Sequence, residues 1–141
     1  MEEAGVAKTT VVALIGDHGW QLGEHNIWGK HTNFELATRV TLIVSVPGLA
    51  PGVSNALVES VDLYPTIAAV AGLPAPPDLN GVDLSPLIKE PGSAAINKVA
   101  YSEHPRCPTD VTKHWGDTTS CVHTARSAFT SMGYSIRAET W

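Results

Sequence analysis

The sequence predicts an α/β protein in which a mixed, mostly parallel sheet is flanked by helices. Two apolar runs, residues 9–15 and 41–46, predict strands, and the first is rich in β-branched residues, which is typical of a central strand covered on both faces. A helix-start signal follows each run. Strand and helix therefore alternate along the chain, as they do in α/β architectures.

The two helices are predicted from their start and stop signals. Thr32 to Glu35 fits the S/T-x-x-E capping box, so a short helix is expected from about Asn33 to Arg39. A second helix is expected from Leu63 to Ala71, with Asp62 as its N-cap, a proline in its first turn and Gly72 as its stop.

The later segments combine loops and strands. The proline-rich segment from Leu73 to Asn80 cannot form regular structure. Strands are expected at Asn97 to Glu103 and at Met132 to Trp141, and the polar segment between them, His104 to Ser127, is expected to be irregular.

Length and composition indicate one globular domain with a modest core. The 141 residues are 43% apolar and 16% charged, and the net charge of −5 does not favour a nucleic-acid partner. No apolar run reaches the roughly 20 residues of a membrane-spanning helix. The N-terminus lacks the basic start and apolar centre of a secretory signal. The chain begins just before one predicted strand and ends inside another, so we expect a fragment of a longer protein.

Polar and titratable side chains crowd the segment GDHGWQLGEHNIWGKHTNFE, residues 16–35, directly after the first strand. In open α/β sheets, ligands bind beyond the carboxyl ends of strands. Asp17 and His18 offer a carboxylate and an imidazole to a divalent cation such as Ca²⁺, Mg²⁺ or Mn²⁺, although two residues cannot complete a shell of six or more ligands. Alternatively, Asp17 caps a turn and His18 is packed.

Cationic and aromatic residues of the same segment suggest an anion site and, separately, a sugar pocket. Lys30 and His31 precede the first predicted helix, where free N–H groups and the helix dipole attract a sulfate or phosphate. Alternatively, Lys30 is a solvated loop residue. Trp20 and Trp28 could wall a sugar pocket, or Trp28 could pack in the core.

Two further pairs leave alternatives open. Glu24 is expected to make turn hydrogen bonds, while His25 could transfer a proton or lie at the surface. Cys107 and Cys121 could form a disulfide, or they are two unrelated thiols; neither lies in a C-x-x-C motif.

Taken together, the motifs resemble the sulfatases of the alkaline-phosphatase superfamily. DHG-x-x-LGEH-x-x-WGK-x-x-NFE, after an apolar strand, is similar to the C-terminal half of their catalytic domain. RVTLIVSVPG (39–48) resembles their next strand, and residues 61–88 resemble their D-x-x-PT helix and G-x-x-L-x-P segment. YSEHPR (101–106) and MGYSIR (132–137) resemble the iduronate-2-sulfatase-like branch.

The resemblance implies a partial alkaline-phosphatase/sulfatase-like fold, in which residues 1–141 are the C-terminal portion of a catalytic domain. Residues 9–90 match best, and residues 97–141 begin the C-terminal strands.

The resemblance also implies roles for individual residues. Asp17 and His18 would be calcium ligands. Lys30 would be the catalytic residue that contacts the sulfate and stabilises charge developing on the ester. Trp20, His25 and His31 would line the substrate site together with Lys30.

The implied full-length enzyme is a sulfuric ester hydrolase of iduronate-2-sulfatase type. It would depend on Ca²⁺ and a formylglycine, act on 2-sulfated uronic acids of glycosaminoglycans or related polysaccharides, and reside in the periplasm, the lysosome or outside the cell. Formylglycine forms in a C/S-x-P-x-R motif that neither Cys107 nor Cys121 fits. We therefore expect the nucleophile elsewhere and this chain to be inactive alone. The alternatives are a phosphodiesterase or phosphonate hydrolase of the same superfamily, and a non-catalytic truncated remnant.

Overall fold

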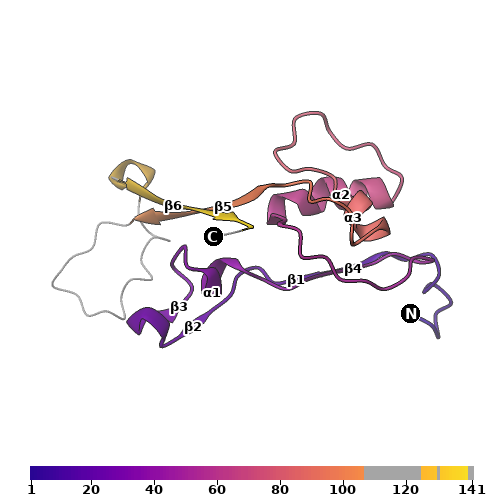
Figure 1. Ribbon diagram of the computed structural model, residues 1–141, viewed down its shortest axis with the longest axis horizontal. Coiled ribbons are helices and arrows are strands. Elements are labelled where there is room, and N and C mark those ends of the chain that lie inside the picture. The colour runs from indigo at the N-terminus through magenta and orange to yellow at the C-terminus, as the bar shows by residue number, and fades with distance from the viewer. Residues whose placement is uncertain (107–124, 130, 140–141) are drawn as a thin grey trace. The chain divides into compact units, whose positions relative to one another are not determined.

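The computed structural model describes residues 1–106, 125–129 and 131–139. They form two compact units (Figure 1): residues 1–15, 41–100 and those from 137 onward make the first, and residues 16–40 and 101–136 make the second. Cys107 and Cys121 lie outside the described residues, so the question of their pairing stays open. Within the described ranges, no helix has the length and apolarity needed to cross a membrane.

The first unit contains the antiparallel pair of β1 (Val12–Ile15) and β4 (Leu42–Ser45), in which Val12 lies opposite Ser45 and Ile15 opposite Leu42. The predicted positions of both strands are confirmed. The mixed sheet expected from the sequence left the direction of this pair open, because an apolar run reports burial and carries no information on strand direction.

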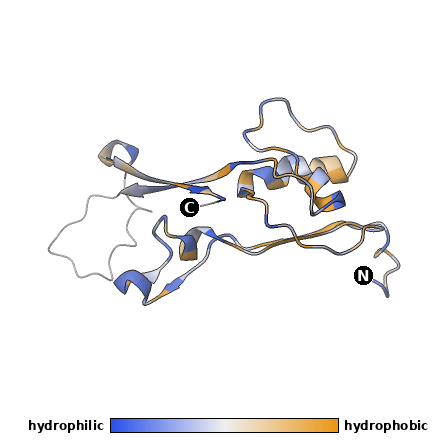
Figure 2. Ribbon diagram, viewed as in Figure 1, coloured by the Kyte–Doolittle hydropathy of each residue, from blue (hydrophilic) through white to orange (hydrophobic). Residues whose placement is uncertain are grey.

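The expectation that the first strand is covered on both faces is wrong for the described residues, and its partner strand is exposed as well. Leu14 is 58% exposed and Ile43 is 55% exposed, and Figure 2 shows the apolar colouring of both strands. Covering a sheet requires a further layer packed on its face. The apolar pattern therefore indicates buried strand faces, but the described residues of this unit do not bury them.

The second helix is confirmed as α2 (Leu63–Val70), and Gly72 follows it with a φ of 70°, the left-handed conformation that glycine adopts readily at helix ends. Asp62 stands at the N-cap position, but its side chain does not cap the helix. The carboxylate is buried and accepts hydrogen bonds from Glu59 N at 2.8 Å, Val82 N at 2.9 Å and Asn97 Nδ2 at 2.7 Å.

Thr66, one turn further along α2, also accepts a hydrogen bond from a backbone N–H group. The buried Thr66 hydroxyl accepts a hydrogen bond of 2.9 Å from Leu84 N, at the start of α3 (Ser85–Lys89), a short helix that the sequence did not predict. Leu84 and Leu87 are buried there. The D-x-x-PT motif is therefore structural here, because its Asp and Thr satisfy backbone N–H groups of the segment that enters α3.

The second unit begins with a small hairpin of β2 (Gln21–Leu22) and β3 (Trp28–Gly29), which pair antiparallel. The 3₁₀ turn η1 (Glu24–Asn26) joins them, with His25 and Asn26 in the left-handed region at φ 56° and 57°. This hairpin places Lys30 directly after β3.

The predicted first helix is reduced to a single turn, α1 (Glu35–Thr38), and the capping-box prediction is wrong. Phe34 is the N-cap residue and no side chain caps the helix. The Thr32 hydroxyl instead donates to Oε1 of the buried Gln21 at 2.9 Å and accepts from Phe34 N at 3.3 Å. Threonine often makes such local bonds in place of a cap, because its hydroxyl reaches several nearby groups.

The last strands are β5 (Val99–Arg106) and β6 (Ser131–Ala138), which pair with each other. Both predicted strands are confirmed with shifted bounds. The extension of β5 through Arg106 means that the start of the segment predicted as irregular is strand. Two 3₁₀ turns, η2 (Ser60–Asp62) and η4 (Arg126–Ala128), complete the described elements.

Candidate functional site

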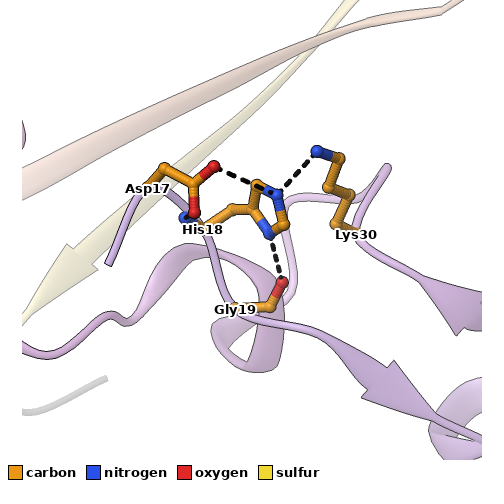
Figure 3. Close-up of polar contacts among 4 residues, drawn as sticks. All are labelled: Asp17, His18, Gly19 and Lys30. Atoms are coloured by element: carbon orange, nitrogen blue, oxygen red, sulfur yellow. Dashed lines mark hydrogen bonds and ion pairs between the residues drawn. The ribbon is translucent and has the colours of Figure 1, made fainter. Parts of the chain in front are cut away.

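The His18 imidazole has an orientation and a tautomer that its contacts fix. Its Nδ1 lies 2.8 Å from the carbonyl oxygen of Gly19 (Figure 3). A carbonyl can only accept, so Nδ1 carries the proton and donates. Nε2 of the neutral ring is then left with its lone pair, which is the form of histidine that binds cations.

Lys30 and Asp17 both approach this Nε2. The Lys30 ammonium donates to it at 2.6 Å, and Asp17 Oδ2 lies 3.4 Å from it. The contact with Asp17 is an ion pair only when His18 is protonated. Asp17 is 87% exposed, so solvent screens its charge and the Lys30 contact dominates.

Asp17 and His18 would offer a divalent cation one oxygen ligand and one nitrogen ligand. Asp17 Oδ2 and His18 Nε2 lie 3.4 Å apart, so one cation could contact both side chains. The described residues contain no group of three or more acidic, His or Cys side chains around one point. The pair therefore fits one part of a cation site. A bound cation and the Lys30 ammonium would compete for the same lone pair.

The loop that carries His18 is held close to α1. Gly19 N donates to Ala37 O at 2.8 Å, and a Cβ at Gly19 would overlap the backbone carbonyl of Leu36. Only glycine allows this approach, and the same residue supplies the carbonyl that orients His18. The sequence prediction missed Gly19, whose one signal was its place directly after Asp17 and His18.

The tryptophans of the segment are both exposed. The Trp20 ring lies beside His18, with 6.2 Å between ring centroids, and is 52% exposed. Trp28 is 75% exposed, so the alternative that it packs in the core is wrong. Trp20 therefore borders the group formed by Asp17, His18 and Lys30.

The two other histidines pack on different partners. His25 stacks on Phe34 with 4.1 Å between ring centroids and 17° between ring planes. His31 lies against His104 of β5 at 5.7 Å, a contact that the resemblance of residues 101–106 did not specify. The proposed substrate roles of Trp20, His25, Lys30 and His31 stay predictions.

Glu24 makes the turn hydrogen bond that the sequence predicted. Its Oε2 accepts from Leu22 N at 2.7 Å. This backbone hydrogen bond, reinforced by a second one to its own N–H, holds the pKa of the Glu24 carboxyl below its usual 4.5. Glu24 therefore stabilises the turn at neutral pH as an ionised acceptor.

Comparison with known sequences places these motifs in a family. The model of the family described as N-sulphoglucosamine sulphohydrolase, C-terminal, matches residues 23–127. Iduronate 2-sulfatase of Mus musculus is 31% identical over 97% of this chain, and N-acetylglucosamine-6-O-sulfatase of Bacteroides thetaiotaomicron is 30% identical over 82% of it. The chain spans 32% of the first relative and 22% of the second.

Solved structures agree on the fold. A protein in complex with its substrate, D-glucosamine-2-N,6-O-disulfate, matches 97% of this chain with 26% identity and a TM-score of 0.75, over 25% of its own length. A phosphonate monoester hydrolase from Silicibacter pomeroyi matches 76% with 33% identity and a TM-score of 0.69, over 21% of its length. The predicted α/β class is confirmed as part of an alkaline-phosphatase-like fold. With the family model matched over residues 23–127, this chain belongs to the sulfatases.

Proposed function

We propose that the protein to which this chain belongs hydrolyses sulfate esters, and that its substrates are 2-sulfated uronic acids of glycosaminoglycans or related polysaccharides. One observation carries the proposal: the ammonium of Lys30 and the carboxylate of Asp17 both approach the imidazole of His18. The 31% and 30% identity to mouse and human iduronate 2-sulfatase supports the substrate class.

Each residue of the group has a separate task in this proposal. Asp17 and His18 would hold Ca²⁺, and Gly19 keeps the His18 lone pair available. The bound cation supplies positive charge against the sulfate oxygens. Lys30 binds a sulfate oxygen and stabilises the negative charge that develops on the ester oxygen as the bond to sulfur breaks.

The nucleophile is proposed to come from another part of the enzyme. No C/S-x-P-x-R motif, the kind that yields formylglycine, occurs in the 141 residues. The residues of this chain therefore bind and polarise the sulfate, and they do not attack it.

Binding of a sulfated sugar tests the proposal without turnover. An NMR titration in saturating Ca²⁺ compares a 2-sulfated uronate disaccharide with its unsulfated form. The sulfated sugar should bind more tightly, and Lys30→Ala should weaken its binding about 10- to 100-fold, because a hydrogen bond to a charged group contributes about 1.5–3 kcal/mol. Lys98→Ala, which removes an exposed lysine of the other unit, is the matched control and should change nothing. Equal binding of both sugars, or an unaffected Lys30→Ala, would contradict the proposal.

A phosphonate monoester hydrolase is the second candidate, favoured by the 33% identity to the Silicibacter pomeroyi enzyme. Its substrate also carries an anionic ester that Lys30 could contact. Competition between a sulfate monoester and a phosphonate monoester for the same NMR-detected site separates the two, and tighter binding of the phosphonate ester would favour this candidate.

A further inference from the structure

A cavity of about 400 Å³ lies in the second unit, and none of its lining residues belongs to the site described above. The cavity is lined by Ile27, Thr32, Asn33 and Phe34 and by Gly133 to Ser135 of β6. This volume falls within the roughly 300–1,000 Å³ of typical small-ligand sites. We refer to it as the Phe34–Tyr134 pocket.

The lining of the pocket is uncharged and amphipathic. Phe34 and Tyr134 supply aromatic surface, Asn33 supplies an amide, and Ser135 supplies a hydroxyl. No lining residue is acidic or basic, so a sulfate or carboxylate gains no ionic partner inside. A pyranose ring matches this lining, because its C–H faces pack on aromatic rings while its hydroxyls exchange hydrogen bonds with amides and hydroxyls.

The aromatic wall is held in place before any ligand binds. His25 stacks on Phe34, and the Thr32 hydroxyl accepts from Phe34 N while it donates to the buried Gln21. Such support lowers the entropy that a ligand must overcome when it orders the site. Tyr134 stays 71% exposed and Phe34 46% exposed, so both offer surface that a ligand could cover.

Part of the pocket wall comes directly after Lys30, the proposed sulfate-binding residue, in the sequence. Thr32 N donates to Lys30 O at 2.8 Å, so the two residues form one tight turn, with Lys30 before the pocket and Thr32 in its wall. We propose that the Phe34–Tyr134 pocket binds an uncharged pyranose ring next to the sulfated residue of the polysaccharide. The proposal rests on the proposed function for the identity of that polysaccharide.

The test uses the uncharged disaccharide N,N′-diacetylchitobiose in an NMR titration of the whole chain. Shifts should concentrate on the lining residues, and Tyr134→Ala should weaken binding about tenfold. Tyr134→Phe keeps the aromatic face and should stay within about twofold of the wild type. Tyr64→Ala removes a 61% exposed tyrosine of α2 and should leave binding unchanged.

Three outcomes would overturn the pocket proposal: no binding of chitobiose, binding that Tyr134→Ala does not weaken, or equal losses of chitobiose affinity in Tyr134→Ala and Tyr64→Ala. These outcomes are distinct from failure of the proposed function. If chitobiose binds in the pocket while sulfation and Lys30→Ala have no effect, the sulfatase assignment fails and the pyranose site stands. If sulfation and Lys30 matter but chitobiose does not bind, the pocket proposal fails alone.

Discussion

Gly19 joins the fold to the candidate site, so replacing it with alanine should disturb both. The added Cβ would overlap the carbonyl of Leu36 on α1. Backbone atoms cannot rotate aside as a flexible side chain would, so the loop and the helix must separate by about 1.4 Å to restore an ordinary contact. Gly19 has no positive φ, so the effect is steric and not conformational.

The size of the effect follows from the contacts that this movement disrupts. Overpacking of this kind costs about 1–3 kcal/mol. Separation by about 1.4 Å also breaks the 2.8 Å hydrogen bond from Gly19 N to Ala37 O, which adds about 1 kcal/mol. We expect Gly19→Ala to lower the free energy of unfolding by about 2–4 kcal/mol, a large part of the roughly 5–15 kcal/mol of a typical domain.

Urea denaturation followed by circular dichroism measures the change. Gly92→Ala is the matched control, since a Cβ there meets nothing within 4 Å and should change the unfolding free energy by less than about 0.5 kcal/mol. The His18 ring signals should also shift in Gly19→Ala, because the Gly19 carbonyl holds Nδ1. A Gly19→Ala protein as stable as Gly92→Ala would refute the reasoning.

Two further predictions concern carboxylates. Asp62→Ala removes a buried carboxylate that accepts three hydrogen bonds, so it should lower the free energy of unfolding by about 3–5 kcal/mol, as measured by urea denaturation. The control Asp78→Ala, at an exposed position, should be nearly neutral. Equal losses in the two variants would contradict the structural role of Asp62. Because hydrogen bonding lowers the folded-state pKa of Glu24, its carboxylate stabilises the turn above the unfolded pKa, and this contribution is lost as pH falls through the folded pKa. A carbon-13 NMR titration should place its midpoint below 4.5, and a midpoint at or above that value would show that the Leu22 hydrogen bond does not form in solution.

The sequence predicted the elements that local residue patterns encode. Strands β1 and β4 follow from their apolar runs, and α2 follows from its proline and its terminal Gly72. The pairing direction of β1 and β4 was not predictable, because it depends on where the intervening chain travels. The predicted length of α1 was too great, because the Thr32 hydroxyl does not cap the helix and donates instead to Gln21, 11 residues away.

The candidate site was predictable as a set of residue types and not as a geometry. The order of Asp17, His18 and Lys30 suggested a cation and an anion, but it could not show that Lys30 and Asp17 meet at one nitrogen of His18. The role of Asp62 was misassigned for a similar reason. Its partners Val82 and Asn97 lie 20 and 35 residues away, beyond the reach of a capping rule.

The most direct test of the central claim is the nitrogen-15 NMR signal of His18 Nε2 during a Ca²⁺ titration. The structure predicts a protonated Nδ1 and an unprotonated Nε2 that contacts Lys30. Ca²⁺ should displace the Lys30 ammonium and shift the Nε2 signal. The shift should appear only well above micromolar Ca²⁺, because Asp17 and His18 fall far short of the roughly 6–8 ligands that Ca²⁺ requires. Asp17→Ala should abolish the shift. A proton on Nε2, an unmoved signal, or saturation below micromolar Ca²⁺ would contradict the account.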